Sequence, residues 1–200
     1  MSTDDFVKFG EKLLESNRLR LRVTTEDDFE LLHSWWLDPT VMMLQSIGAA
    51  LLKDRDAIIG MFRTWSKTTE SGFGYSIARK DTNQLIGHIA LWGITVKDQC
   101  ANAGIILNPQ VWGQGYGKES LLLTLRYSFQ ELNLHRVQLE VQADNTRAIR
   151  CYKNAGFREE GIRRQVYFRN GKWRDQMLMG ILAHEFRDDN GVMECPGGTE

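Results

Sequence analysis

Cysteine and proline are scarce in this chain of 200 residues, which has only three of each. The cysteines Cys100, Cys151 and Cys195 lie far apart and form no Cys-x-x-Cys pair, so the sequence predicts neither a disulfide framework nor a zinc ribbon. Scattered cysteines favour a reducing compartment, and we expect the protein to be cytoplasmic. The four histidines show no metal-ligand spacing, and we therefore expect no metal.

Charge of either sign is balanced, and long apolar runs are missing. The formal net charge is −1 and no run of lysine and arginine stands out, so we expect no nucleic-acid partner. No apolar run approaches the ~18 residues that a membrane span requires, and the charged residues 1–17 show no signal peptide, so we expect no membrane partner. We expect one domain over residues 18–186, with an N-terminal extension over 1–17 and a flexible tail over 187–200.

The most informative segment that is present is the glycine-rich run Gln110-Val-Trp-Gly-Gln-Gly-Tyr-Gly117. It follows an apolar run that predicts a strand, and it precedes an expected helix over residues 119–132. Glycine lets a backbone approach a phosphate closely, and a helix N-terminus adds partial positive charge there. The turn therefore predicts an anion site, although its spacing fits neither a Walker loop nor the dinucleotide fingerprint.

A second segment runs from Asp144 to Phe157 and predicts a short helix after a strand. Asp144 or Asn145 is suited to cap the start of this helix, and Gly156 is suited to follow its end. Within the helix, Asn145, Ala148 and Tyr152 recur at spacings of three and four. They therefore lie on one helical face.

Hydrophobic periodicity predicts an α/β fold in which helices and a sheet form separate layers, as in α+β proteins. The paired residues Asn170-Gly171 are a strong hairpin signal, and Thr25 with Asp28 approximates a capping box. Pro39 is expected to end the first helical region. The expected strands cover residues 18–23, 73–79, 84–96, 101–107, 136–141, 157–168 and 172–184, and the expected helices cover 25–36, 51–67, 119–132 and 145–155.

Both segments resemble motifs of the GNAT (GCN5-related) N-acetyltransferases. Gln110, Gly113 and Gly115 match the pyrophosphate loop Q/R-x-x-G-x-G/A, and the run from Asn145 to Phe157 is similar to N-x-x-A/S-x-x-x-Y-x-x-x-G-F. The ends of the domain resemble the RimJ/RimL-like branch of ribosomal-protein N-terminal acetyltransferases. The resemblance implies a GNAT fold, whose central mixed sheet is largely antiparallel and flanked by helices.

The resemblance also implies acetyl-CoA as co-substrate and a set of residues that hold it. Backbone N–H groups from 112 to 118 would hold the pyrophosphate, and the strand at 105–107 would pair with the pantetheine arm and polarise the thioester carbonyl. Tyr152 stands where the family has its general acid. The implied cofactor-binding residues are Ile105, Ile106, Leu107, Gln110, Val111, Trp112, Gly113, Gln114, Gly115, Tyr116, Gly117, Lys118, Asn145, Ala148 and Tyr152.

The general base is the point at which the chain departs from the family pattern. Asn102 occupies a position where many RimJ/RimL-like sequences have glutamate, and an amide cannot accept the proton. Glu160 matches an acidic position used by some members and is the alternative base, although a surface role at a strand end fits it equally well. The acidic residues 26–28 and 30 fit either a cationic substrate or the dipole of their helix.

The acceptor is predicted to be a primary amine, on a protein N-terminus or on a small molecule. An α-amine has a pKa near ~7.8 and is partly neutral at pH 7, whereas a lysine or polyamine amine demands more of a base. An enzyme that modifies aminoglycosides or polyamines is one alternative, and a non-catalytic acyl-CoA-binding module is another. The branch often pairs as homodimers, which the resemblance implies here too.

Overall fold

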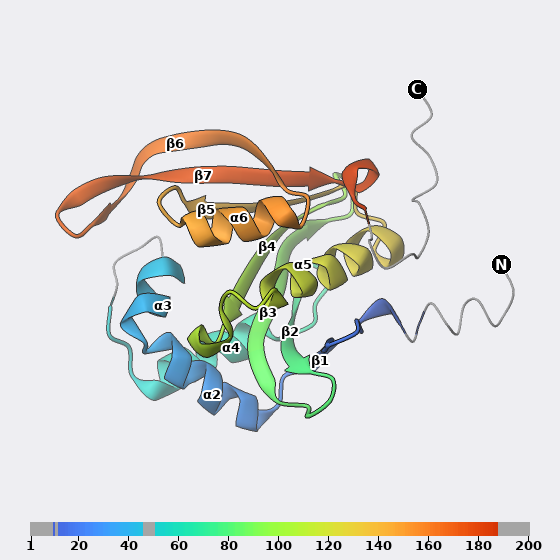
Figure 1. The fold of residues 1–200 in the computed structure, drawn as a ribbon, viewed down its shortest axis with the longest axis horizontal. Coiled ribbons are helices and arrows are strands. Elements are labelled where there is room, and N and C mark those ends of the chain that lie inside the picture. Colours follow the sequence, from blue (N-terminus) through green and yellow to red (C-terminus); the bar gives the residue numbers. More distant parts are fainter. Residues whose placement is uncertain (1–9, 11, 46–50, 188–200) are drawn as a thin grey trace, which may run out of the picture.

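The computed structural model describes residue 10, residues 12–45 and residues 51–187 (Figure 1). The expected tail over 187–200, apart from residue 187, and most of the expected extension over 1–17 lie outside these residues. Within them the chain forms a single sheet of seven strands in the order β1-β2-β3-β4-β5-β7-β6. The strands are β1 (Leu19–Arg22), β2 (Gly72–Arg79), β3 (Leu85–Thr95), β4 (Cys100–Leu107), β5 (Arg136–Gln142), β6 (Arg158–Arg169) and β7 (Lys172–Leu182).

Five α-helices accompany the sheet in the described part of the chain. None of them is long and apolar enough to cross a membrane. Short 3₁₀ turns at Pro109–Val111 and Ala183–Glu185 and a wider π-type turn at Tyr127–Glu131 complete the chain. The helices are α2 (Glu26–Trp36), α3 (Pro39–Gln45), α4 (Arg55–Trp65), α5 (Tyr116–Arg126) and α6 (Thr146–Asn154).

Strand pairing confirms the expected mixed, largely antiparallel sheet. Every neighbouring pair is antiparallel except β4 and β5, which run parallel. The predicted hairpin joins β6 to β7, and Asn170 and Gly171 both have positive φ, as a two-residue type I′ turn requires. Figure 1 shows this hairpin reaching past α6 toward α3, where the Arg169 guanidinium lies 3.5 Å from the Met43 sulfur.

Two hydrophobic clusters hold helices to the two faces of the sheet. The larger cluster joins α5 and α6 to side chains such as Leu91, Ala103 and Leu139. The smaller one joins α2 and α4 to Ile106 and Leu85 on the other face. Because side chains alternate along a strand, β4 serves both clusters and separates them.

The first helical region differs from the expectation. Helix α2 ends at Trp36 as predicted, but Pro39 begins a further helix, α3, instead of ending the region. Proline is well tolerated at the first position of a helix, because its missing N–H would have no partner there. Helix α4 is shorter than expected because Asp54 caps it, accepting a hydrogen bond from the Ala57 N–H at 2.8 Å.

Asp28 has a structural role at the start of α2. Its buried carboxylate accepts hydrogen bonds from the Thr25 N–H at 2.8 Å and from Ser76, and it pairs with Arg22. Burial alone would raise the pKa of Asp28, but these hydrogen bonds outweigh it and hold the pKa below its ordinary value. Glu26 and Glu30 pair with Arg63 and Arg55, so three of the four acidic residues of α2 have cationic partners within the fold.

The buried His88 makes folding sensitive to pH. It is 2% exposed and lies 2.9 Å from the Ser66 hydroxyl, and burial lowers its pKa to about 4, against a weaker opposing effect of Asp28. The unfolded chain binds a proton on His88 below about pH 6.5, whereas the folded chain does not until about pH 4. This contribution to stability is therefore present above pH 6.5 and is lost as the pH falls toward 4.

We predict that the free energy of unfolding falls more steeply between pH 7 and pH 4.5 in the parent than in a His88→Gln variant. The expected difference is about 2 to 3 kcal/mol, from the pKa shift of His88. Urea unfolding at both pH values measures it, with the exposed His184→Gln as the matched control. Parallel pH dependences in the parent and His88→Gln would contradict the prediction.

Candidate active site

A cavity opens where strands β4 and β5 separate. Their parallel ladder contains three residue pairs and ends at Asn102 and Gln138. Beyond that pair lies a cavity with a volume of about 780 Å³. Its walls come from β4, β5, Trp92 of β3, the glycine-rich turn, α3, α5 and α6.

The cavity passes through the sheet from one face to the other. Ala103 and Leu139 line it on the face covered by α5 and α6, which we call the loop side because the glycine-rich turn lies there. Asn102, Gly104 and Glu140 line it on the opposite face, which we call the α3 side. A reagent bound on one side can therefore reach a reagent bound on the other.

The glycine-rich turn forms the loop side as the sequence predicted. Gly113 has a φ of 77°, and Gly115, the N-cap of α5, has a φ of 84°, a backbone conformation that side chains other than glycine disfavour. Gly117 permits a close approach to α6, since a Cβ there would lie 2.9 Å from the Cys151 sulfur. The first turn of α5 thus presents its N–H groups at the cavity wall, where an anion is favoured.

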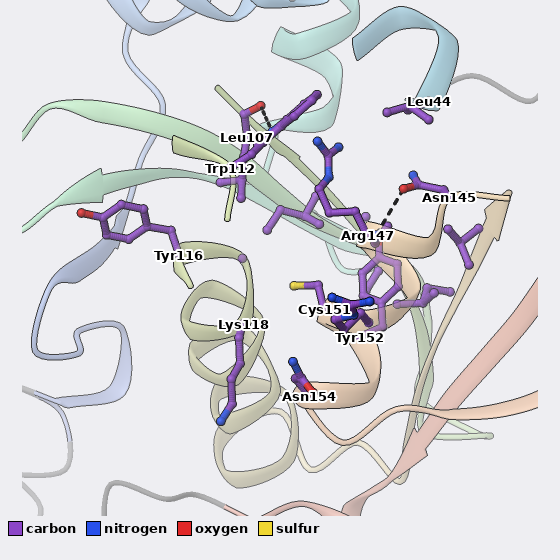
Figure 2. Close-up of a pocket in the computed structure, with 18 of the residues that line it drawn as sticks. Leu44, Leu107, Trp112, Tyr116, Lys118, Asn145, Arg147, Cys151, Tyr152 and Asn154 are labelled. Atoms are coloured by element: carbon purple, nitrogen blue, oxygen red, sulfur yellow. Dashed lines mark hydrogen bonds between the residues drawn. The ribbon is translucent and has the colours of Figure 1, made fainter. Parts of the chain in front are cut away.

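Arg18 holds this turn from outside the cavity. Its guanidinium donates to the Gln114 carbonyl at 3.2 Å, bonds Glu119 at 2.8 Å, and lies 4.5 Å from the centre of the Tyr116 ring. Figure 2 shows the Tyr116 side chain turned away from α6. Tyr116 therefore offers the cavity its backbone more than its ring.

Helix α6 is fixed at both ends, which sets the position of Tyr152. The Asn145 side chain accepts the Ala148 N–H at 3.2 Å at the start. At the end, Gly156 has a φ of 102° and the Phe157 N–H bonds the Tyr152 carbonyl at 3.0 Å, which is a Schellman motif. Both features match the sequence prediction for this segment.

Tyr152 is partly buried at the wall of the cavity (Figure 2). Burial raises the pKa of its hydroxyl, the neighbouring Cys151 raises it further, and Arg147 lowers it slightly. The hydroxyl therefore keeps its proton at neutral pH. It is suited to donate a hydrogen bond or a proton, and not to act as a base.

Cationic side chains border the loop side. Arg147 rises from α6 toward Trp112 in Figure 2, and its guanidinium carbon lies 3.2 Å from the centre of the Trp112 ring. The indole N–H of Trp112 bonds the Leu107 carbonyl at 3.1 Å, which fixes the ring. With Lys118 and Arg150 also in the wall, this side carries positive charge and suits a phosphate-bearing ligand.

The α3 side carries amides and one carboxylate. Trp92 lies opposite Asn102 across strands β3 and β4. The Asn102 amide donates to the Trp92 carbonyl at 3.4 Å and accepts from Gln138 at 3.1 Å. Glu140, two residues further along β5, is the only carboxylate among the described residues that line the cavity.

Most of the predicted cofactor residues line the cavity, and four of the predicted site residues do not. Ile106 points into the core beneath α2 and α4, while Gln110 and Gln114 are outside the cavity wall. Glu160 is also outside it, and its carboxylate pairs with Arg136, which lowers its pKa. The predicted residues that do line it are Ile105, Leu107, Val111, Trp112, Gly113, Gly115, Tyr116, Gly117, Lys118, Asn145, Ala148 and Tyr152.

Sequence reasoning missed the α3 side almost entirely. The alternation of side chains along β5 places Glu140 on the face opposite Leu139. The local sequence does not indicate that β5 separates from β4 at this point. Val41 and Leu44 come from α3, which the sequence did not predict. Arg147 lies within a recognised segment and could have been noted as a cation on the helix that carries Tyr152.

Comparison with known proteins agrees with this architecture. Residues 18–158 match the acetyltransferase (GNAT) domain family. The uncharacterized N-acetyltransferase YoaA of Bacillus subtilis (strain 168) is 28% identical over 172 residues, which cover 85% of this chain and 96% of YoaA. Spermidine N(1)-acetyltransferase of Vibrio cholerae is 35% identical over 102 residues, which cover 51% of this chain and 59% of that enzyme.

A solved structure extends the likeness to three dimensions. The spermidine N-acetyltransferase from Vibrio cholerae, crystallised in complex with CoA and spermine, has a TM-score of 0.75 to this chain at 25% identity. The match covers 85% of this chain and 98% of that one. The chain thus belongs to the GNAT acetyltransferase superfamily and is an acetyl-CoA-dependent N-acetyltransferase.

Proposed function

We propose that the chain transfers an acetyl group from acetyl-CoA directly to a primary amine, with Tyr152 as the general acid. The observation that carries this proposal is the cavity through the sheet, which joins the glycine-rich turn on one side to Glu140 on the other and has Tyr152 in its wall. Acetyl-CoA supplies the activated acetyl thioester. The residues of the chain hold the two reagents and move the protons.

The loop side fits CoA by its chemistry. Gly113 and Gly115 keep the turn open, the start of α5 favours a pyrophosphate, and Lys118, Arg147 and Arg150 supply positive charge. We propose that β4 beyond Asn102 bonds the pantetheine arm, because its ladder with β5 stops at that residue. Three of the predicted cofactor residues, Ile106, Gln110 and Gln114, do not line the cavity. We propose that they support CoA binding only through their backbone and through the fold.

Tyr152 is proposed to protonate the departing thiolate. Its burial and raised pKa keep the hydroxyl protonated until charge develops on the sulfur. The thiolate of a thiol with a pKa near ~8.5 is a weaker base than a phenolate. The Tyr152 hydroxyl therefore donates its proton as negative charge develops on the sulfur, and not before the thioester bond breaks. The fixed ends of α6 hold the residue in place for this step.

Glu140 replaces Glu160 in our proposal as the carboxylate that receives the amine proton. Both carboxylates pair with an arginine, but Glu140 lies in the cavity wall on the α3 side, whereas Glu160 lies outside the wall. The Arg163 guanidinium donates to one Glu140 oxygen at 2.7 Å and the Gln176 amide donates to the other at 2.8 Å. These bonds orient the carboxylate.

Two observations bear on the class of acceptor amine. The relatives named above include spermidine acetyltransferases, which supports a small amine or polyamine. The RimJ/RimL-like resemblance supports a protein N-terminus, and it stays a hypothesis. The limits of the domain at residues 18 and 186, the cytoplasmic location and the homodimer also stay predictions.

We predict that Gly113→Val weakens CoA binding at least tenfold. No protein atom lies within 4 Å of the Cβ position at Gly113, but its φ of 77° disfavours valine, so the substitution would both strain the turn and occupy the space proposed for the pyrophosphate. Isothermal titration with CoA measures the affinity, and Gly171→Val is the control because Gly171 also has a positive φ, 71°, and equally open surroundings. Unchanged affinity in a folded Gly113→Val protein would place CoA elsewhere.

We predict that Tyr152→Phe lowers kcat by about 10²- to 10⁴-fold while the affinity for acetyl-CoA changes little. The phenyl ring keeps the packing, and only the proton donor is lost. Steady-state kinetics and acetyl-CoA titration together separate these effects. A kcat within about twofold of the parent, with chemistry rate-limiting, would remove Tyr152 from the mechanism and favour a non-catalytic acyl-CoA-binding module.

We predict that Glu140→Gln lowers kcat/KM near pH 7 and that the activity recovers as the pH rises. A neutral amine at high pH no longer needs a proton acceptor, so the loss should shrink there. The pH–rate profiles of Glu140→Gln and Glu160→Gln, recorded side by side, measure the effect. An upward shift in Glu160→Gln alone would return the role of the base to Glu160.

A further inference from the structure

The charge on the α3 side bears on which amine the cavity accepts, on the basis of the function proposed above. Glu140 is the only carboxylate among the described residues that line the cavity. Glu140 pairs with Arg163, and other carboxylates nearby also have arginine partners: Asp144 pairs with Arg174, and Glu160 pairs with Arg136. A second positive charge on the acceptor would find no further carboxylate in this wall.

Arginines of the β6–β7 hairpin add positive charge beside Glu140. Arg163 bonds Glu140 directly, so its guanidinium offsets part of the negative charge of that carboxylate. Arg169 reaches Met43 on α3, next to Leu44 in the cavity wall. A polyamine would bring its second ammonium toward these cations, and like charges at short range repel.

Apolar side chains also line this side, beside the Asn102 and Gln142 amides. Val41 and Leu44 face the cavity from α3, and the Trp92 ring packs against Gly104, where a Cβ would lie 3.0 Å from it. Trp92 is 51% exposed, although it is a large aromatic side chain. An apolar group next to the reacting amine would cover part of this surface and gain free energy by leaving water.

We propose that the acceptor is an amine with a single positive charge and an apolar group beside it, such as the α-amine of an apolar residue, and not a polyamine. Glu140 holds the one ammonium, Trp92 and Leu44 contact the apolar group, and Arg163 disfavours a second ammonium. This specificity differs from that named for the spermidine acetyltransferases similar to the chain.

The test compares norleucine amide with lysine amide, which share an α-amine and a four-carbon side chain and differ in a terminal ammonium. Glycine amide lacks the apolar group, and spermidine is the polyamine. Release of CoA thiol from acetyl-CoA gives kcat/KM for each amine. We expect norleucine amide to exceed each of the other three at least tenfold.

A higher kcat/KM for lysine amide or spermidine would overturn this inference and leave the proposed function standing. The proposed function itself would be overturned if a protein that binds CoA released no CoA thiol with any of these amines or with a peptide beginning with leucine. Comparison of leucine amide, a small molecule, with the peptide beginning with leucine distinguishes a small-molecule acceptor from a peptide N-terminus. Acetylation of either supports the inference.

Arg163→Gln tests the electrostatic step separately. We expect it to reduce the preference for norleucine amide over lysine amide about tenfold, because it removes the cation beside Glu140. Arg164→Gln is the matched control, since it removes the same charge from the next, exposed residue of β6. An equal preference in the parent, Arg163→Gln and Arg164→Gln would overturn the role of Arg163.

Discussion

The site depends on the short parallel ladder between β4 and β5. Three residue pairs hold the two halves of the sheet together, and the ladder ends at Asn102 and Gln138. A longer ladder would close the sheet and remove the cavity, while a shorter one would weaken the join between β1–β4 and the β5–β7–β6 unit. The candidate active site therefore lies where the hydrogen-bonded pairing of β4 and β5 stops.

Helix ends supply the groups that surround this opening. Helix α5 brings its N-terminal N–H groups through a turn that only glycines adopt easily, and α6 brings Tyr152 between an asparagine cap and a Schellman motif. On the opposite face, α3 covers the opening with apolar side chains. The two faces thus differ in chemistry, with phosphate-binding groups on one side and amides, a carboxylate and apolar groups on the other.

The sequence predicted the features that depend on local backbone chemistry. The glycine-rich turn, the caps of α6 and the Asn170-Gly171 hairpin are specified by a few adjacent residues, and the mixed sheet followed from their order. It did not predict α3, because Pro39 is compatible with both the end and the start of a helix. It also did not place Glu140 or Glu160, since their neighbours are set by strand register and by a bulge between Glu159 and Gly161.

The contacts of Arg18 give the edge of the sheet an influence on the loop. Arg18 immediately precedes β1, and it reaches Gln114, Tyr116 and Glu119, while Ser16 bonds the same Glu119 at 2.6 Å. Opening of β1 by local fluctuation would release these contacts, so the turn and the strand form one cooperative unit. By thermodynamic linkage, a ligand that binds the ordered turn would slow hydrogen exchange in β1, although no residue of β1 lines the cavity.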